Sequence, residues 1–283
     1  MSAEQIILSV ADITCLIQKR VYNDFVEEFK LDPISFNLSN YETLGLVGES
    51  GSGKTTLGRL ITGALKATDT KERRIIIDGK VEFMGQHDYR NPKVRKSLNY
   101  PIQMIYQDPK VALNEFMEVR SQIIEAAEVG YEKVKTNLSK DNWIINNVNE
   151  LFDIMMLDDI QNHYPFIMSG GQIRRLGVAR VLAAQPKIII ADEPTASLDA
   201  STKNMVLNYL SEYTNRRKND GLPMGSIIIS HDLETISRYC GKVLVMQNGQ
   251  LVEKLKKDRK GIFDPKKTFT KKLWEDNAFF VRA

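Results

Sequence analysis

Short apolar runs recur along the chain, separated by polar residues, glycine or proline. The runs at residues 43–47, 187–191, 226–230 and 242–246 combine β-branched and other apolar residues, which is typical of strands buried on both faces. Apolar residues at helical spacing predict helices between them, for example at residues 54–65 and 201–213. This alternation predicts an α/β fold with a mainly parallel sheet covered by helices.

Two regions depart from the alternation. Residues 6–17, 34–38, 74–78 and 80–84 predict strands joined by short turns, and Asp78-Gly79 predicts a hairpin between the last two. We therefore expect an antiparallel β flank. Residues 114–163 are richer in helical pattern, with helices expected at 121–129 and 143–156 and the Met155-Met156 pair filling the core. This stretch predicts an inserted helical subdomain.

The composition narrows the class of protein. The 39 Lys and Arg against 36 Asp and Glu give a net charge of only +3, which does not favour a nucleic-acid partner, and we interpret the basic residues 254–260 as a solvated surface. Apolar runs fall well short of the ~20 residues of a membrane span, and residues 1–5 lack signal-peptide features. We expect a cytoplasmic chain that does not itself cross a membrane. Cys15 and Cys240 are too few for a four-cysteine metal site and are expected to be reduced packing residues.

The strongest motif follows the strand predicted at residues 43–47. It reads Gly48-Glu49-Ser50-Gly51-Ser52-Gly53-Lys54-Thr55-Thr56 and matches G-x-x-x-x-G-K-[ST] in a strand–loop–helix context. Its glycines let backbone N–H groups and the helix N-terminus form a cradle for phosphate. Lys54 can reach the β- and γ-phosphates, Thr55 can ligate Mg²⁺, and Thr56 can contact an inner phosphate. This phosphate loop predicts nucleotide binding.

A second candidate lies at the end of the strand predicted at residues 187–191, where Asp192 and Glu193 follow. Successive strand residues point to opposite faces, so we expect the two carboxylates to differ in role. Asp192 can hold Mg²⁺, directly or through water. Glu193 can polarise the attacking water as general base. A solvated turn is the alternative for an isolated Asp-Glu, but the phosphate loop in the same chain favours catalysis.

A third motif, Ser169-Gly170-Gly171-Gln172, precedes a helical run and predicts another anion-binding helix terminus. Ser-Gly-Gly-Gln between a phosphate loop and an acidic strand end resembles the signature of ATP-binding cassette (ABC) ATPases. The rest of that pattern follows in family order: Gln107 resembles the Q-loop, Ser197-Leu198-Asp199 the D-loop, and His231 the switch histidine.

The resemblance implies a P-loop NTPase (RecA-like) core at residues 1–110 and 181–252, a helical subdomain at 111–180 and a tail at 253–283. It also implies ATP with Mg²⁺, held by Thr55, Gln107 and Asp192. Glu193, His231, Gln107 and Lys54 would be the catalytic set. In an implied head-to-tail dimer, the phosphate loop of one subunit would face residues Ser169, Gly170, Gly171 and Gln172 of the other.

A closer resemblance is to the ATPases of peptide and nickel importers, through residues 45–59, 106–114, 164–180, 230–233 and 269–273. It implies that the chain binds membrane-spanning permease subunits and a second ABC ATPase, and that it acts indirectly with an extracytoplasmic solute-binding protein. It also implies a peripheral membrane protein on the cytoplasmic face of the cell membrane. With two cysteines, the chain is similar to the partner without the four-cysteine iron–sulfur tail. An exporter partner or an ATP-gated regulatory module is the alternative.

Some positions depart from the family pattern. Met168 opens the signature instead of Leu, Ile173 follows it, and Phe166 stands where the peptide branch often has His. The adenine-stacking aromatic is unassigned, because alignment puts Ile17 there, with Tyr22 and Phe25 nearby. Residues 108–119 are either a docking surface for a membrane partner or an ordinary capped helix and loop.

Overall fold

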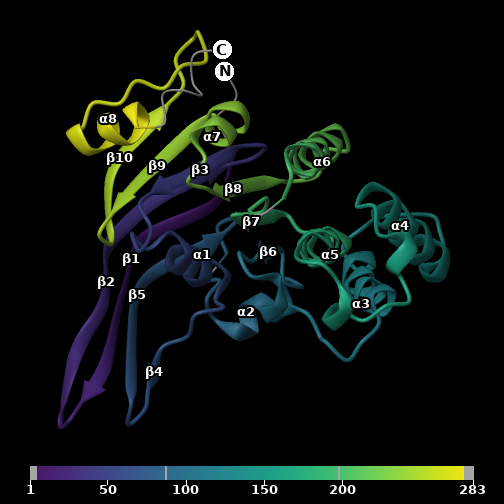
Figure 1. The fold of residues 1–283 in the computed structure, drawn as a ribbon, viewed down its shortest axis with the longest axis horizontal. Helices are drawn as coiled ribbons and strands as arrows, with labels where there is room; N and C mark the ends of the chain where they lie inside the picture. The colour runs from purple at the N-terminus through teal and green to yellow at the C-terminus, as the bar shows by residue number, and fades with distance from the viewer. Residues whose placement is uncertain (1–4, 87, 197, 277–283) are drawn as a thin grey trace. The chain divides into compact units, whose positions relative to one another are not determined.

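The computed structural model describes residues 5–86, 88–196 and 198–276. The chain divides into two compact units. The first comprises Met1–Lys96 and Pro223–Ala283, and the second comprises Ser97–Leu222. In Figure 1 the first unit therefore carries the purple-to-blue and yellow ends of the colour scale, and the second carries the teal and green middle.

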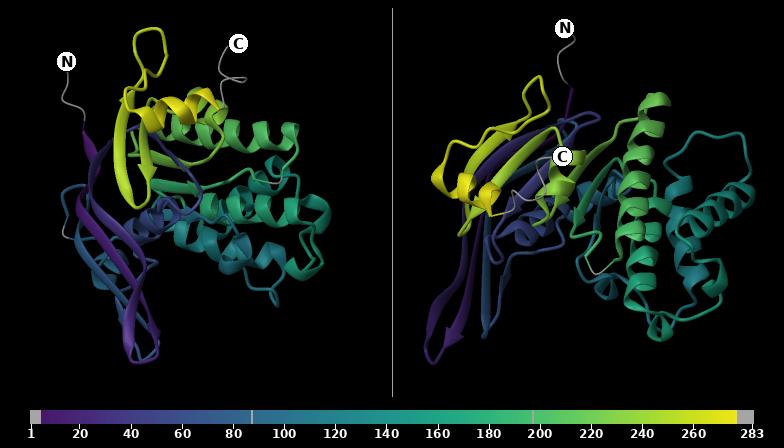
Figure 2. Two further views of the ribbon diagram at one scale, coloured as in Figure 1. Left: turned by 60° about the vertical axis from the view of Figure 1, so that its left-hand side comes forward. Right: turned by 45° about the horizontal axis from the view of Figure 1, so that its top comes forward.

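The first unit contains the antiparallel flank that the sequence predicts. Its strands are β1 (Ile6–Val21), β2 (Asp24–Ser39), β4 (Thr68–Asp69) and β5 (Arg73–Phe83), in the order β2-β1-β5-β4. All pairs in this sheet are antiparallel. The long β1–β2 hairpin and β5 run side by side away from the other strands of the unit, as Figure 2 shows.

The predicted hairpin at Asp78-Gly79 is wrong, because β5 runs through both residues without turning. The pairing of β1 with β5 shifts between Ala11↔Lys80 and Thr14↔Asp78, so two residues of β1 oppose Gly79 alone. Gly79 has a φ of 86°, and a Cβ there would lie 2.3 Å from the backbone oxygen of Asp12. The glycine therefore serves a β-bulge rather than a turn.

The first unit also holds strands in the order β10-β9-β3-β8. These are β3 (Thr43–Gly48), β8 (Gly225–Ile229), β9 (Lys242–Gln247) and β10 (Gln250–Lys256). β3 pairs in parallel with β8 and β9, while β10 is antiparallel to β9. The interiors of β3, β8 and β9 are buried on both faces, as predicted.

Helices α1 (Lys54–Thr62), α2 (Pro92–Ser97), α7 (Leu233–Tyr239) and α8 (Thr268–Glu275) accompany these strands. α1 ends before the predicted residue 65, because Gly63 adopts a φ of 69° and caps it. A cluster under α7 and α8 includes Cys240, Phe263 and Trp274. Burial raises the pKa of Cys15 to about 11 and that of Cys240 to about 12, so both behave as packing residues, as expected.

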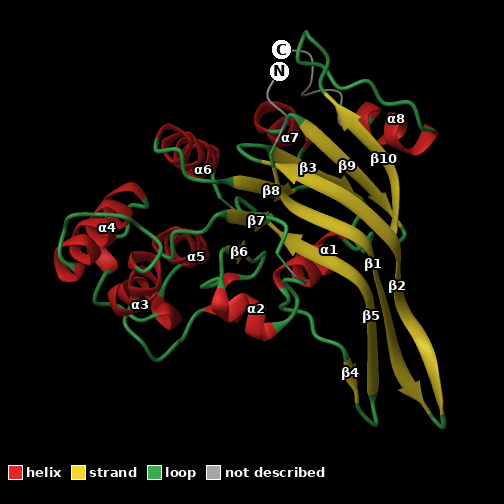
Figure 3. Ribbon diagram, turned by 180° about the vertical axis from the view of Figure 1, so that it is seen from behind, coloured by secondary structure: helices red, strands yellow, loops and turns green. Residues whose placement is uncertain are grey.

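The second unit pairs β6 (Ile102–Ile105) in parallel with β7 (Ile188–Asp192). Between them lie α3 (Val119–Tyr131), α4 (Lys140–Ile154) and α5 (Gly170–Ala183), with the short helices η1 (Pro109–Ala112), η2 (Asp158–Ile160) and η3 (Pro165–Ile167). α6 (Ala200–Asn219) follows β7. Figure 3 shows this helical character in red.

The helices of the second unit explain one correction. α4 ends at Ile154, so only Met155 is fully buried. Met156 has a φ of 52° and is 64% exposed, and the prediction that it fills the core is wrong. The change of backbone direction at the helix end turns the second methionine outward.

Candidate nucleotide site

The phosphate loop joins β3 to α1 in the first unit. Gly48 and Gly53 have φ values of 147° and 102°. A Cβ on Gly48 would meet the backbone oxygen of Met246 at 2.0 Å, and one on Gly53 would meet the Phe29 ring at 2.8 Å. Both positions therefore need glycine for backbone conformation and for close approach.

The start of α1 is shaped by glycine and lysine. Its N-cap is Gly53, no side chain caps it, and its first turn carries no acidic residue. The Nζ of Lys54 donates to the carbonyl oxygens of Gly48 at 2.9 Å and Glu49 at 2.7 Å, and to the Ser52 hydroxyl at 3.2 Å. An ammonium held over a helix N-terminus in this way is suited to bind a polyphosphate.

The remaining residues of the phosphate loop differ in solvent exposure. Glu49, Ser50 and Gly51 are exposed, whereas Ser52 and Gly53 are buried beneath the loop. Thr55 and Thr56 lie half-buried in the first turn of α1. Their hydroxyls are therefore near the end of the helix where phosphate and a cation would be expected.

His231 is brought to the same sheet edge as the phosphate loop. β3 and β8 run parallel with Leu46 paired to Ile229, so Gly48 and His231 each lie two residues beyond that pair. His231 is exposed. The following Asp232 caps α7 by accepting hydrogen bonds from the N–H groups of Glu234 and Thr235, which fixes the turn that carries the histidine.

Sequence reasoning missed Phe29 as a candidate for the adenine contact. Phe29 pairs across the hairpin with Ile17, the position where an aromatic was expected. Its half-buried ring lies against Gly53 of the phosphate loop. Tyr22 instead lies in the hairpin turn and is 96% exposed, and Phe25 has the Arg74 guanidinium 4.3 Å from its ring centre. The pairing of Ile17 with Phe29 across the two strands would have pointed to this ring.

In the second unit, the parallel register of β6 and β7 places two further candidates together. Ile105 pairs with Ala191, so Gln107 and Glu193 each lie two residues past the pair. Gln107 is exposed and Glu193 half-buried, whereas Asp192 is only 1% exposed. Glu193 has a φ of 47°. The two neighbouring carboxylates thus have different environments.

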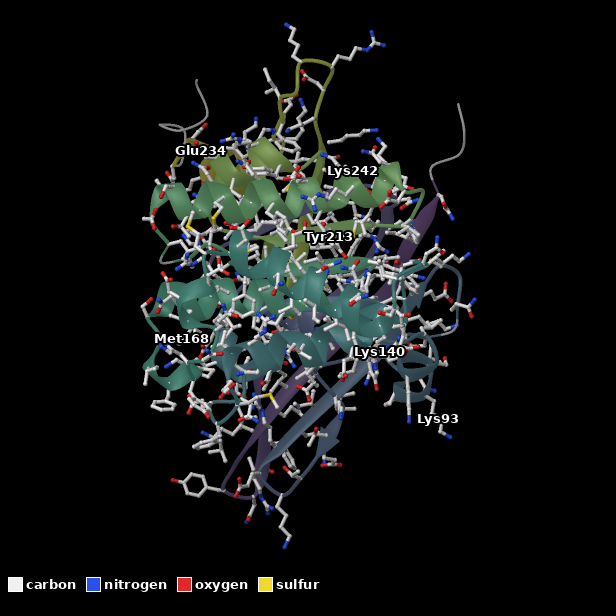
Figure 4. The ribbon with its side chains drawn as sticks, turned by 90° about the vertical axis from the view of Figure 1, so that its right-hand side faces the viewer. Lys93, Lys140, Met168, Tyr213, Glu234 and Lys242 are labelled. Atoms are coloured by element: carbon white, nitrogen blue, oxygen red, sulfur yellow. The ribbon has the colours of Figure 1, made fainter. Side chains whose placement is uncertain are left out.

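The signature residues form the N-terminus of α5. Ser169 is the N-cap: its hydroxyl accepts from the N–H of Gln172 at 3.3 Å, and its own N–H donates to the Gln172 side chain at 2.9 Å. Gly170 and Gly171 present backbone without side chains, and a Cβ on Gly170 would meet nothing within 4 Å. Met168, labelled in Figure 4, precedes this cap in the second unit.

Of the three D-loop candidates, the structure describes Leu198 and Asp199. Ser197 lies outside the residues that the structure describes. Asp199 caps α6 and accepts from the hydroxyls of Ser201 and Thr202 and from both of their N–H groups. These hydrogen bonds, that of the Ser201 hydroxyl first, lower the pKa of Asp199.

The residues present fit both implied ligands. The phosphate loop has the uncapped helix start and the lysine that a nucleotide phosphate needs. Thr55 in the first unit, and Gln107 and Asp192 in the second, each carry a side-chain oxygen, the kind of ligand that Mg²⁺ prefers. No helix in the described part of the chain is both long and apolar enough to cross a membrane.

The chain is similar to known proteins of one family. A family model described as "ABC transporter" matches residues 31–196. The oligopeptide transport ATP-binding protein OppF of Lactococcus lactis subsp. lactis is 36% identical over 247 residues, which cover 86% of this chain and 70% of that protein. OppF of Bacillus subtilis is 38% identical over 79% of this chain and 68% of its own length. The dipeptide transport protein DppF of Escherichia coli is 34% identical over 86% of this chain and 67% of its own.

Solved structures share the fold. A dimeric ATP-binding cassette bound to ADP and Pi has a TM-score of 0.69 at 21% identity, covering 88% of this chain and 98% of that one. The cbiO1 protein of Clostridium perfringens has a TM-score of 0.62 at 26% identity, covering 89% and 88%. The predicted P-loop NTPase fold and the predicted family are confirmed. The chain belongs to the ABC transporter family and is one of its ATP-binding and ATP-hydrolysing cassettes.

Proposed function

We propose that this chain is the ATPase subunit that energises import of oligopeptides or dipeptides through membrane-spanning permease subunits. The observation that carries the proposal is its 34–38% identity, over 79–86% of its length, to proteins named for oligopeptide and dipeptide transport. The importer-like tail at residues 269–273 supports the same branch. Nickel or another small solute falls within the wider resemblance.

Nucleotide binding uses the phosphate loop, residues 48–56. The N–H groups at the start of α1 and the Lys54 ammonium hold the phosphates, and Phe29 provides a ring against which adenine can stack. Thr55, Asp192 and Gln107 would hold Mg²⁺. When bound, that ion supplies positive charge to the β- and γ-phosphates.

Hydrolysis needs a base and a means of orienting the reacting phosphate. Glu193, which is half-buried, takes the proton of the attacking water. His231 orients the γ-phosphate end. Gln107 follows the end of β6 and couples nucleotide occupancy to the helices of its unit. Ser169, Gly170, Gly171 and Gln172 act on the nucleotide of a second ATPase, homologous or identical.

We assign these roles to three predicted parts of the chain: a nucleotide-binding core at 1–110 and 181–252, a helical subdomain at 111–180 and a tail at 253–283. The proposed docking surface for a permease is residues 108–119. Two of its apolar side chains, Val111 and Phe116, are 65% and 89% exposed. The buried Gln122 of α3 holds this loop by donating to the carbonyl oxygens of Asn114 and Met117, and by accepting from the Asn114 N–H. A loop fixed from below that presents apolar side chains outward suits a protein partner.

The whole complex would then place this chain on the cytoplasmic face of the cell membrane, held there by its permease. It would work with an extracytoplasmic solute-binding protein only through the membrane subunits. No nucleic-acid partner is proposed, since the net charge is only +3.

The test is an affinity purification of the tagged Glu193→Gln chain from solubilised native membranes with Mg-ATP, read by mass spectrometry. This variant is expected to stay in the ATP-bound state and to retain its partners. Two multi-span permeases and a second ATPase should be recovered, and Lys54→Ala, which should not bind ATP, is the matched control. Recovery of ribosomal or DNA-repair proteins without membrane proteins would contradict the transport function.

A further inference from the structure

Arg174 connects the signature helix to the turn that carries Glu193. It lies on α5, in the turn that follows the signature, and is half-buried. Its Nη1 donates to the backbone carbonyl oxygen of Glu193 at 2.8 Å. The same carbonyl accepts from the N–H of Ala196 at 3.2 Å. The guanidinium therefore helps to hold the backbone at the end of β7.

The charges around Arg174 come from two segments. Burial lowers the pKa of Arg174, while the carboxylates of Glu193 and Asp108 act in the opposite direction. Asp108 follows Gln107 directly and caps η1. One positive charge thus lies within electrostatic reach of the proposed base and of the residue next to Gln107.

The packing of α5 supports this connection. Gly177 lies three residues beyond Arg174 on the helix, and a Cβ there would meet Pro109 of η1 at 2.9 Å. A glycine therefore lets η1 approach α5 closely, beside the arginine. The segment after Gln107 and the segment after β7 are both held against the same helix.

The backbone of Glu193 needs such support. Its φ of 47° is in the left-handed region, which an L-residue occupies at a cost. Strained conformations of this kind persist where the surrounding structure holds them. A donor fixed on its carbonyl limits rotation of the peptide that follows Glu193 and so restricts where its side chain can point.

We propose that Arg174 is a positioning residue for hydrolysis: its guanidinium holds the Glu193 carbonyl and so keeps the general base aligned with the signature helix and with the segment after Gln107. This rests on the proposed role of Glu193 as base. Arg174 touches neither nucleotide nor water in this account. It acts through Glu193, so its loss should affect turnover rather than nucleotide affinity.

The test compares Arg174→Met and Arg174→Lys in the full-length chain. The readouts are kcat and KM for ATP hydrolysis, the affinity for a fluorescent ATP analogue, and Tm. Arg174→Met should lower kcat about 10–100-fold, since small misplacements of a catalytic group are costly, with KM changed less than about 2-fold. Arg174→Lys should recover most of kcat, because a single donor is needed to reach one carbonyl oxygen.

Arg216→Met is the matched control. Arg216 belongs to the same unit and pairs with Glu150 and Glu212 on α4 and α6. Loss of these half-exposed ion pairs should leave kcat and KM unchanged. If Arg174→Met does not fold, Arg174→Gln keeps an amide donor without the charge and carries the same comparison.

The possible outcomes distinguish a failure of the Arg174 proposal from a failure of the proposed role of Glu193. Wild-type kcat in Arg174→Met, with Glu193→Gln inactive, would overturn the positioning role alone. A parallel fall of Tm, affinity and kcat that lysine does not rescue would reduce Arg174 to a structural residue. Wild-type turnover by Glu193→Gln would instead overturn the base assignment itself.

Discussion

The two glycines Gly48 and Gly51 of the phosphate loop offer a matched test of its geometry. Both have positive φ, 147° and 79°. A Cβ on Gly48 would lie 2.0 Å from the backbone oxygen of Met246, its partner on β9, whereas a Cβ on Gly51 would meet nothing within 4 Å. Alanine at Gly51 should therefore introduce only backbone strain, and alanine at Gly48 should add a clash with a paired strand.

The expected costs follow from these contacts. Backbone strain at Gly51→Ala should lower the free energy of unfolding by about 1–2 kcal/mol. Gly48→Ala should add overpacking of about 1–3 kcal/mol, because β3 and β9 must separate to admit the methyl group. At roughly 2–4 °C of Tm per kcal/mol for a domain of this size, Gly48→Ala should melt roughly 2–12 °C below Gly51→Ala.

The assay is thermal unfolding of both full-length variants by circular dichroism, in the same buffer and without nucleotide. Gly221→Ala is a useful third variant, since Gly221 also has positive φ, 66°, with nothing within 4 Å of its Cβ, and lies outside the phosphate loop. It should resemble Gly51→Ala. A Tm for Gly48→Ala equal to or above that of Gly51→Ala would refute the reasoning from close approach.

Three further results are expected. Glu193→Gln should bind ATP yet lose at least about 100-fold in turnover, and Lys54→Ala should lose binding as well; nucleotide binding and phosphate release measure both, and full turnover by Glu193→Gln would remove the base from that position. Phe29→Ala should weaken ATP affinity by roughly 5–10-fold through lost stacking, with Phe29→Tyr near wild type in equilibrium titration; equal affinities would exclude the adenine contact. Burial lowers the pKa of Lys133 to about 8. Above that pH the unfolded chain binds more protons than the folded chain, so the free energy of unfolding should rise between about pH 8 and 10. Lys133→Met should lose this rise in denaturant titrations, and the same rise with pH in the variant would contradict the reasoning.

The features of this molecule that its sequence predicts well depend on residues that lie close together in the chain. The phosphate loop, Asp192 and Glu193 all follow apolar β-branched runs, and such runs predict buried strands without knowledge of their neighbours. The strands β3 and β7 then bring each motif to a carboxyl end. Local sequence sufficed because both strand and loop are specified within about a dozen residues.

The parts that failed depend on which strand lies opposite. Asp78-Gly79 has the composition of a hairpin turn, but Gly79 faces two residues of β1 and forms a bulge instead. Phe29 was missed for a similar reason, since its place beside Gly53 follows from the pairing of β1 with β2 and not from its spacing to the loop. Cross-strand register is long-range information, and a single sequence holds it only weakly.

The signature shows a third limit. Its Ser and Gly residues predict an anion-binding terminus, and the structure adds that the Ser169 hydroxyl and the Gln172 side chain cap α5 reciprocally. Arg174 follows the same motif on α5, but its hydrogen bond to the Glu193 carbonyl joins positions nineteen residues apart. No helical or strand period relates these two residues, so only the fold could bring them together.

The most direct test of the central claim is uptake of a labelled oligopeptide by native cells in which this chain is replaced by its Glu193→Gln variant. We expect uptake to fall to the level of cells without the chain, although the variant is present in the membrane fraction at wild-type abundance. Restoring the wild-type chain should restore uptake. Undiminished peptide uptake in the Glu193→Gln cells would contradict the account, because transport would then not depend on hydrolysis by this subunit.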